Sequence, residues 1–232
     1  MRDSSPLGTP PVALDPNRVE QLHQFANLLL AENARMNLTA ARDSAALWNR
    51  HIADSLRLLQ CPEVESTHTL LDLGSGGGLP GIPLAIARPQ LEVVLLEATR
   101  KKVRALQSFI DTLGLRNTSC RWGRAEELAH DPAWRQRFDL VTARAVAPLR
   151  QLVELGAPLC RPGGYLAAYK GPNVDQELSE ARHALETLHC RPVRRLSYRT
   201  GEAQFHLLVL EVTAAVPHRY PRNAARIKQR PL

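Results

Sequence analysis

The spacing of apolar residues changes near residue 68, from a helical period to short runs typical of strands. Upstream, Asp15-Pro16 supplies an N-cap and a proline at the first helical position, and apolar residues follow on one helical face. This pattern predicts a helix that ends near Met36-Asn37 and a second helix from Asp43 to about Leu59. The first 14 residues are rich in Pro, Ser and Gly, which predicts a disordered leader.

Downstream, apolar runs alternate with helical segments, which predicts a doubly wound, mainly parallel α/β sheet. The predicted strands are Thr69–Leu73, Leu91–Leu96, Thr118–Trp122, Phe138–Ala143, Tyr165–Tyr169, Val193–Tyr198 and Phe205–Val212. The predicted helices are Pro80–Ala87, Thr99–Leu113, Pro148–Leu159 and Asn173–Leu188. Only Thr200–Gln204 separates the last two strands, so we expect a hairpin and one antiparallel edge strand.

This pattern suggests four parts. They are a leader over residues 1–14, an N-terminal helical cap over 15–65, an α/β domain over 66–216 and a basic C-terminal tail over 217–232.

Composition indicates an ordinary globular protein, with 44% hydrophobic and 23% charged residues. No stretch approaches the roughly 20 apolar residues that a membrane helix needs, and the first residues lack the apolar run of a signal peptide. We therefore expect a cytoplasmic protein without a membrane partner. The four cysteines are dispersed and no histidine cluster accompanies them, so no metal site is predicted.

The formal net charge of +7 is concentrated near the C-terminal end. Residues 191–199 and 217–232 together hold nine Lys and Arg side chains and no acidic residue. A polyanionic partner such as a nucleic acid would meet mainly this end of the chain. A merely solvated surface is the alternative interpretation.

The strongest chemical signal is the glycine-rich turn that follows the first predicted strand. From Asp72 onward it fits D-x-G-x-G-x-G, the pattern of Rossmann-like methyltransferases, whereas a dinucleotide fingerprint needs glycine where the chain has Leu79. In such a turn the acid can accept from the ammonium group of S-adenosylmethionine, and backbone amides can face its carboxylate. A tight turn without a ligand is the alternative.

Two further positions fit a nucleoside. Glu97 ends the second predicted strand, where a carboxylate can accept from both ribose hydroxyls, although NAD would use the same position. The loop Gly123–Glu127 follows the third strand and would pass the adenine, with Glu126 and Glu127 as alternative contacts. The alternative is acidic charge at a helix N-terminus. It is compatible with the ribose role at Glu97, and taken alone it explains the Glu126/Glu127 pair better than an adenine contact does.

Several motifs, in order and spacing, resemble the RsmG (GidB) family over roughly residues 15–232. They are LLDLGSGGGLPGIP, LLEATRKKVRAL, GRAEEL, ARAVAPL, YKGPNVDQEL and, upstream, MNLTA and WNRHIADSL. The resemblance implies a Rossmann-like class I methyltransferase that uses S-adenosylmethionine and methylates N7 of guanine 527, in the 530 loop of 16S ribosomal RNA. The implied partner is that RNA or an assembling small ribosomal subunit. The implied cofactor site comprises Gly74, Gly76, Gly78, Leu79, Glu97, Ala125, Glu126 and Arg144.

Guanine N7 carries a lone pair and no proton, so its methylation needs no general base, and none is predicted. We expect Arg144 and Lys170, at the ends of two strands, to orient the ligands. A structural salt bridge from Arg144 to Asp72 or Glu126 is the alternative. His51 is expected to be a packing residue rather than a catalytic one.

The predicted RNA contacts are cations near strand ends and in the tail: Lys170, Arg199, Arg222, Arg226, Lys228 and Arg230. A non-catalytic RNA-binding assembly factor and a small-molecule or protein methyltransferase remain the alternative functions.

Overall fold

The computed structural model describes residues 10–232. The N-terminal part of these residues forms a helical cap. Helix α1 (Pro16–Met36) starts at Asp15, whose side chain accepts from the backbone N–H of Arg18, as an N-cap should. A second helical stretch follows, made of α2 (Ser44–Leu47), a π-helical turn (Trp48–Ile52), α3 (Ala53–Leu56) and a short 3₁₀ segment (Arg57–Gln60). Both predicted cap helices are present, but the second is not a uniform α-helix.

Seven strands form one sheet in the order β3-β2-β1-β4-β5-β7-β6. The strands are β1 (Thr69–Leu73), β2 (Glu92–Glu97), β3 (Thr118–Trp122), β4 (Phe138–Arg144), β5 (Cys160–Lys170), β6 (Cys190–Thr200) and β7 (Ala203–Val212). The predicted doubly wound sheet is confirmed. All pairings among β1 to β5 are parallel, and β7 runs antiparallel between β5 and the outermost strand β6, as the short hairpin connection requires.

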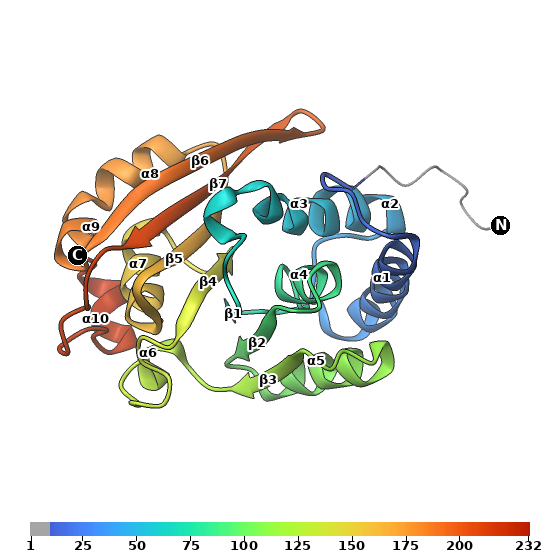
Figure 1. Cartoon of the computed structure of the whole chain (residues 1–232), viewed down its shortest axis with the longest axis horizontal. Helices are drawn as coiled ribbons and strands as arrows, with labels where there is room; N and C mark the ends of the chain where they lie inside the picture. The colour runs from blue at the N-terminus through green and yellow to red at the C-terminus, as the bar shows by residue number, and fades with distance from the viewer. Residues whose placement is uncertain (1–9) are drawn as a thin grey trace.

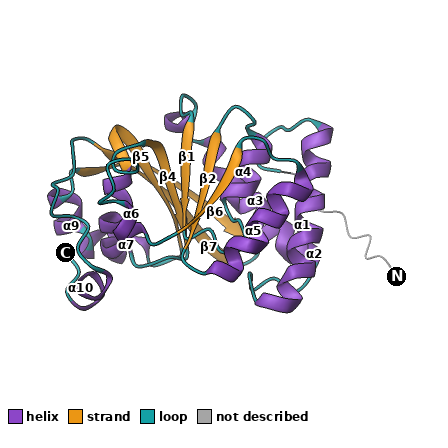
Figure 2. Ribbon diagram, turned by 90° about the horizontal axis from the view of Figure 1, so that it is seen from below, coloured by secondary structure: helices purple, strands orange, loops and turns teal. Residues whose placement is uncertain are grey.

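Helices cover both faces of the sheet, as Figures 1 and 2 show. They are α4 (Gly81–Ala87), α5 (Arg100–Leu113), α6 (Ala125–Leu128), α7 (Leu149–Gly156), α8 (Val174–Glu180), α9 (Arg182–Thr187) and α10 (Ala224–Gln229). The cap and α4 and α5 lie on one flank, and α6, α7, α9 and α10 lie on the other (Figure 2). The predicted helix Asn173–Leu188 is divided in two at Ala181. Within residues 10–232 no helix is long and apolar enough to cross a membrane.

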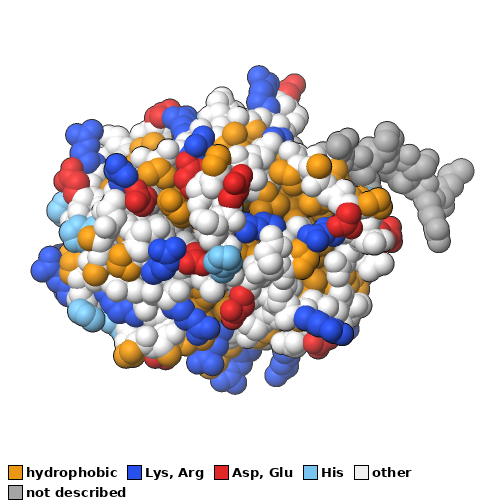
Figure 3. Space-filling model, viewed as in Figure 1, with side chains coloured by type: hydrophobic (Ala, Val, Ile, Leu, Met, Phe, Trp, Pro, Cys, Tyr) orange, Lys and Arg blue, Asp and Glu red, His pale blue; other side chains and the backbone are white. Residues whose placement is uncertain are grey.

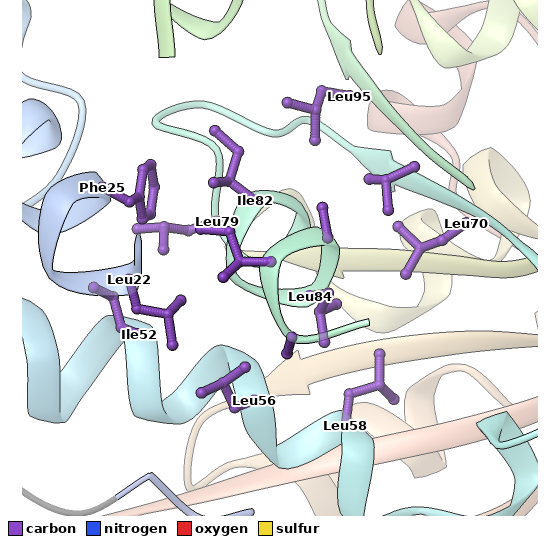
Figure 4. Packing of buried hydrophobic residues seen from close by; sticks show 14 of the residues in the cluster. Leu22, Phe25, Ile52, Leu56, Leu58, Leu70, Leu79, Ile82, Leu84 and Leu95 are labelled. Carbon is purple, nitrogen blue, oxygen red and sulfur yellow. The ribbon is translucent and has the colours of Figure 1, made fainter. Parts of the chain in front are cut away.

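The cap is part of the same hydrophobic core as the helix that follows the glycine-rich turn. Leu22 and Phe25 of α1 and Ile52 of the π-helical turn are fully buried and point toward Leu79 and Ile82 beside that turn (Figure 4). Each such side chain contributes roughly 1.5–3 kcal/mol by leaving water. The cap therefore holds the glycine-rich turn in place.

The ends of the chain differ from the sequence-based expectation. Val12 and Leu14 pack against the cap core and Gln60 donates to the carbonyl of Pro11, so the part of the predicted leader 1–14 that is described is ordered. Its two apolar side chains explain the packing. Residues 1–9 of that predicted leader lie outside the described residues.

The basic segment 217–232 is a folded element rather than a frayed tail. Ile227 of α10 is buried, Tyr220 is nearly so, and Arg135 donates to the backbone carbonyls of Val216 and Tyr220. Because β7 is antiparallel, its last residue pairs with the first residue of β6. The segment therefore starts at the edge where the parallel strands begin, opposite the edge where the glycine-rich turn lies.

Candidate functional site

The glycine-rich turn connects β1 to α4 and is tied to the end of the neighbouring strand. The N–H groups of Gly74 and Ser75 donate to the carbonyl of Leu96 at 2.9 and 3.0 Å. Gly74, Gly76 and Gly78 all have positive φ, at 73°, 56° and 87°, a conformation that L side chains rarely adopt. The turn is thus preset at the carboxyl ends of the strands, where ligands bind in doubly wound sheets.

These three glycines differ in what surrounds them. A Cβ at Gly78 would lie 2.5 Å from Ile82, and one at Gly74 would lie 2.9 Å from Val146, so both positions are closed by the protein itself. A Cβ at Gly76 would meet only the carbonyl of Gly74, at 3.9 Å. Gly76 therefore faces the open side of the turn, where a cofactor has room to approach the backbone.

The carboxylate of Glu97 lies at this open side and accepts hydrogen bonds from the backbone there. Glu97 is 7% exposed; its Oε2 accepts from the N–H of Gly76 at 3.1 Å and its Oε1 accepts from the N–H of Thr99 at 2.7 Å. Each carboxylate oxygen retains a second lone pair that a ribose hydroxyl can use. The residues present therefore fit a nucleoside cofactor at this turn.

Asp72 does not play the part that the sequence suggested. Its side chain is completely buried, with Oδ2 accepting from the N–H of Gly81 at 3.0 Å and Oδ1 from the hydroxyl of Thr142 at 3.2 Å. Burial raises the pKa of this carboxyl to about 6. Asp72 joins β1, β4 and the start of α4 and does not face a cofactor ammonium group.

Three other predicted cofactor contacts lie around the turn. Leu79 is buried in the core beside α1, so only its backbone can face a ligand (Figure 4). Ala125 is buried at the start of α6, and Glu126 is partly buried beside Arg124, 3.6 Å away. Glu127 is exposed, so Glu126 is the acid that the fold turns inward.

Arg144, at the end of β4, is bound to the helical cap. Its Nη1 donates to Asp54 Oδ2 and to the carbonyl of His51, both at 3.2 Å, and its Nη2 donates to His51 Nδ1. The alternative pairing with Asp72 or Glu126 is wrong, because the cap supplies a closer carboxylate. Arg144 therefore connects the sheet to the cap.

This contact fixes the state of His51. Since a guanidinium can only donate, Nδ1 must be the unprotonated nitrogen, and Nε2 carries the proton toward the Thr39 hydroxyl at 3.3 Å. Burial and the charges of Arg144 and Arg50 lower the pKa of His51 to about 4. His51 is a neutral positioning residue.

Lys170 is not available to an RNA phosphate. The residue is 8% exposed, and its Nζ donates to Glu177 Oε2 at 2.8 Å and to the carbonyl of Ala147 at 2.9 Å. The predicted RNA contact is therefore wrong, because the lysine joins β5 to α8 through a salt bridge with Glu177.

The Arg222 side chain is also paired with a carboxylate inside the protein. Its guanidinium and backbone N–H donate to Glu154, which is completely buried in α7. Arg222 therefore anchors the C-terminal segment and does not bind RNA as predicted. Arg226, Lys228 and Arg230 are exposed on or next to α10, whereas Arg199 is exposed near the end of β6, at the edge of the glycine-rich turn.

A cavity of about 540 Å³ lies between the cap, the ends of β4 and β5 and the β6–β7 hairpin. Arg144, Ala145 and Lys170 line its floor, and two aromatic residues, Tyr198 and Phe205, line its hairpin side. Sequence reasoning missed these aromatics, as well as Arg42 and Arg50 at the same cavity, because they come from segments far apart in the chain. One signal was available, since Tyr198 and Phe205 flank the predicted hairpin turn.

One polar atom at this cavity lacks a partner. Asp54 is 9% exposed, and its Oδ1 has no hydrogen-bond partner among the described residues, whereas its Oδ2 accepts from Arg144. Burial raises the pKa of Asp54, and both the neighbouring Tyr198 hydroxyl and the charge of Arg144 act against that rise. Buried acceptors are normally satisfied, so this oxygen can accept from the nearby Tyr198 hydroxyl or from the donor of a ligand.

The sheet order, the glycine-rich turn and the carboxylate at the end of β2 define a class I S-adenosylmethionine-dependent methyltransferase. The fold is similar to that of an O-methyltransferase from Bacillus cereus solved in complex with SAH (TM-score 0.59, 19% identity, covering 81% of this chain and 90% of that chain). It is equally similar to TomG from Streptomyces achromogenes, solved with SAM (TM-score 0.59, 17% identity, covering 88% and 92%).

The sequence places the chain within that class. Residues 18–206 match the family model GidB, described as rRNA small subunit methyltransferase G, and the chain belongs to this family. Curated relatives with the name ribosomal RNA small subunit methyltransferase G include a protein of Moorella thermoacetica, 37% identical over 95% of this chain and 93% of its own length. Another, from Lachnoclostridium phytofermentans, is 36% identical over 100% and 98%. The predicted family and fold are confirmed.

Proposed function

We propose that this protein transfers the methyl group of S-adenosylmethionine to N7 of guanine 527 in 16S ribosomal RNA, in the cytoplasm, on naked RNA or an assembling small subunit. Family membership and the names of the relatives support a ribosomal RNA substrate. The observation that carries the choice of acceptor is the cavity at the end of β4, which combines aromatic walls with a buried, unpartnered carboxylate oxygen.

The cofactor would be held by the turn and its two flanking strand ends. In this proposal the turn formed by Gly74, Gly76, Gly78 and Leu79 faces the cofactor's amino-acid part through its open side at Gly76. Glu97 accepts from the ribose, and Ala125 and Glu126 face the adenine. When bound, the cofactor supplies an electrophilic methyl group on a sulfonium. Arg144 contributes by holding the cap and β4 together around that point.

The chemistry of the acceptor cavity fits guanine. The N1–H and N2–H donors of guanine lie on its Watson–Crick edge, and Asp54 Oδ1 is a buried acceptor that could take one of them in place of the Tyr198 hydroxyl. Holding that edge leaves N7 on the opposite side of the ring, free to point toward the glycine-rich turn. The N7 lone pair then forms the new bond to carbon while the carbon–sulfur bond breaks, and no proton has to be removed. Catalysis is therefore a matter of positioning.

The residues around the mouth of the cavity suit a polyanion. Arg42, Arg50 and Arg199 are exposed at this edge, and none of them forms an ion pair among the described side chains. We propose that these cations, rather than those of α10, contact phosphates near the target base.

The test is methylation of 16S ribosomal RNA by the purified protein with labelled cofactor, followed by mapping of N7-methylguanine. We expect one modified position in wild type. An Asp54→Asn variant, which replaces one carboxylate oxygen by a donor, is expected to lose transfer while cofactor affinity by calorimetry stays within a few-fold. Cofactor binding without any transfer to RNA or to assembling subunits would favour the non-catalytic assembly factor, and transfer to small molecules or proteins alone would favour a different acceptor.

A further inference from the structure

Trp122, at the end of the edge strand β3, is the large hydrophobic side chain that the described part of the chain leaves most exposed, at 49%. Its position is fixed, because the indole Nε1 donates to the carbonyl of Ala98 at 2.9 Å. The guanidinium of Arg100 lies over the ring, 4.2 Å from its centroid. An immobilised aromatic ring that carries a cation and still exposes half of its surface is a feature of sites that stack nucleobases.

The surroundings of Trp122 are cationic. Exposed side chains come from the start of α5 and the residues after β3: Arg100, Lys101, Arg104 and Arg124. Arg121, although exposed, lies over the ring of Trp134 on the other face of the strand. Among residues 10–232, only Arg124 of this group has a carboxylate partner, Glu126. In Figure 3 Lys and Arg side chains gather along the lower rim, over the part of the molecule where Figure 1 shows β3 and α5. We call Trp122 and the four cations Arg100, Lys101, Arg104 and Arg124 the β3 platform.

Apart from the contact between Arg100 and the Trp122 ring, the stability of the fold does not explain the cations of the β3 platform. The first turn of α5 contains no acidic residue, and its N-cap Thr99 makes no side-chain hydrogen bond. Cations there oppose the positive end of the helix dipole and destabilise the helix slightly. Their concentration beside an exposed tryptophan is therefore better explained by an anionic partner than by helix stability.

The β3 platform lies on the same edge of the sheet as the cofactor turn. Trp122 is the register partner of Glu97, and Gly123 N–H donates to the carbonyl of Glu97 at 3.1 Å. The acceptor cavity lies at the ends of β4 and β5, on the other side of the turn. An RNA strand whose target base enters the cavity would therefore reach Trp122 by passing over the glycine-rich turn, along the same edge of the sheet.

We propose that the β3 platform binds an unpaired nucleotide of the RNA substrate, with its base stacked on Trp122 and its phosphates near Arg100 and Lys101. This inference rests on the proposed function for the identity of the RNA. It extends that function by assigning a second RNA contact, outside the acceptor cavity.

The test measures the affinity of wild type and Trp122→Ala for an unstructured oligoribonucleotide, together with the quenching of tryptophan fluorescence. Stacking predicts that Trp122→Ala weakens binding on the order of tenfold and that Trp122→Phe largely restores it. Wild-type fluorescence is quenched on binding, and the Phe variant binds without the part of that quench that comes from Trp122. Trp48 is buried, and the partly exposed Trp134 is common to both proteins, so the difference between the two reports on Trp122.

A charge-matched pair tests the cations. Arg100→Gln with Lys101→Gln is expected to flatten the dependence of log affinity on log salt by roughly 1.4, about 0.7 for each lost phosphate contact. Arg226→Gln with Lys228→Gln, on α10, removes the same charge from the opposite edge and is expected to leave the slope nearly unchanged. Equal slopes in the two double variants would overturn the proposal.

Cofactor affinity separates the β3 platform from the cofactor site. If Trp122→Ala weakens cofactor binding and leaves oligonucleotide binding intact, Trp122 belongs to the adenine site and the proposal is wrong. Absence of methyl transfer by wild type would reject the proposed function, but the oligonucleotide affinities and the quench would still decide the role of the β3 platform.

Discussion

Arg144 and His51 lie on opposite sides of the junction between the sheet and the helical cap, and the guanidinium donates to the imidazole Nδ1. The same guanidinium pairs with Asp54, so one strand-end arginine holds two residues of the cap. The geometry of the acceptor cavity therefore depends on a contact between segments more than 90 residues apart in the chain.

Replacing Arg144 by Ala should destabilise the protein as well as slow methyl transfer. The change leaves the largely buried Asp54 carboxylate without its partner, and we expect a loss of about 3 kcal/mol in the free energy of unfolding. Denaturant unfolding measures it. Adding Asp54→Asn should recover part of that loss, since the unpaired charge is then gone; a fully additive double variant would contradict the pairing.

His51 should make stability depend on pH. Its pKa of about 4 in the fold lies below the usual 6.5, so the unfolded chain takes up the proton first. The contribution of neutral His51 is complete above about pH 6.5 and is lost as the pH falls toward 4. Asp72, with a raised pKa of about 6, acts in the opposite direction, so the useful comparison is with a variant that lacks only the histidine.

That variant is His51→Asn, which keeps an acceptor for Arg144 and does not titrate. Between pH 7 and pH 4.5 we expect wild type to lose more stability than His51→Asn, as measured by urea unfolding at each pH. Parallel curves for the two proteins would show that the histidine does not titrate differently in the folded and unfolded states.

Gly76 and Gly81 should respond differently to alanine. At Gly76 the added methyl group enters open space, so the main cost to folding is the positive φ, roughly 1–2 kcal/mol, and cofactor affinity should fall by tenfold or more, about 1.4 kcal/mol. At Gly81 the Cβ would lie 2.3 Å from Leu95 and 2.7 Å from Asp72 Oδ2, so we expect roughly 3 kcal/mol of lost stability. Calorimetric titration and thermal unfolding separate the two effects.

Arg222 should be a stability residue, unlike its basic neighbours. Arg222→Gln leaves the buried Glu154 carboxylate without a charged partner, and a loss of about 3 kcal/mol is expected. Arg226→Gln should change stability by less than about 0.5 kcal/mol, because that side chain is exposed and unpaired among the described residues. A similar loss in both variants would argue against the anchoring role.

The sequence predicted the sheet, its hairpin and the glycine-rich turn because these depend on local period and turn chemistry. It failed at Lys170 and Arg222, whose type and position suggested RNA, because their carboxylate partners Glu177 and Glu154 could be identified only from the three-dimensional packing. The acceptor cavity was missed for the same reason. Its walls come from the cap, two strand ends and the hairpin, and no motif joins them.

The π-helical turn at Trp48–Ile52 contains one residue more than an α-helical turn would. Its N–H to carbonyl bond from Ala53 to Trp48 spans one residue more than an α-helical bond does. Removing one residue here would restore an ordinary helix with its hydrogen bonds intact, and would turn everything on its N-terminal side by about 100°. The helix would survive, but side chains before the deletion, such as the buried Leu47, would be turned away from the core of the cap. The extra residue therefore aligns the cap with the sheet and is not needed to form the helix.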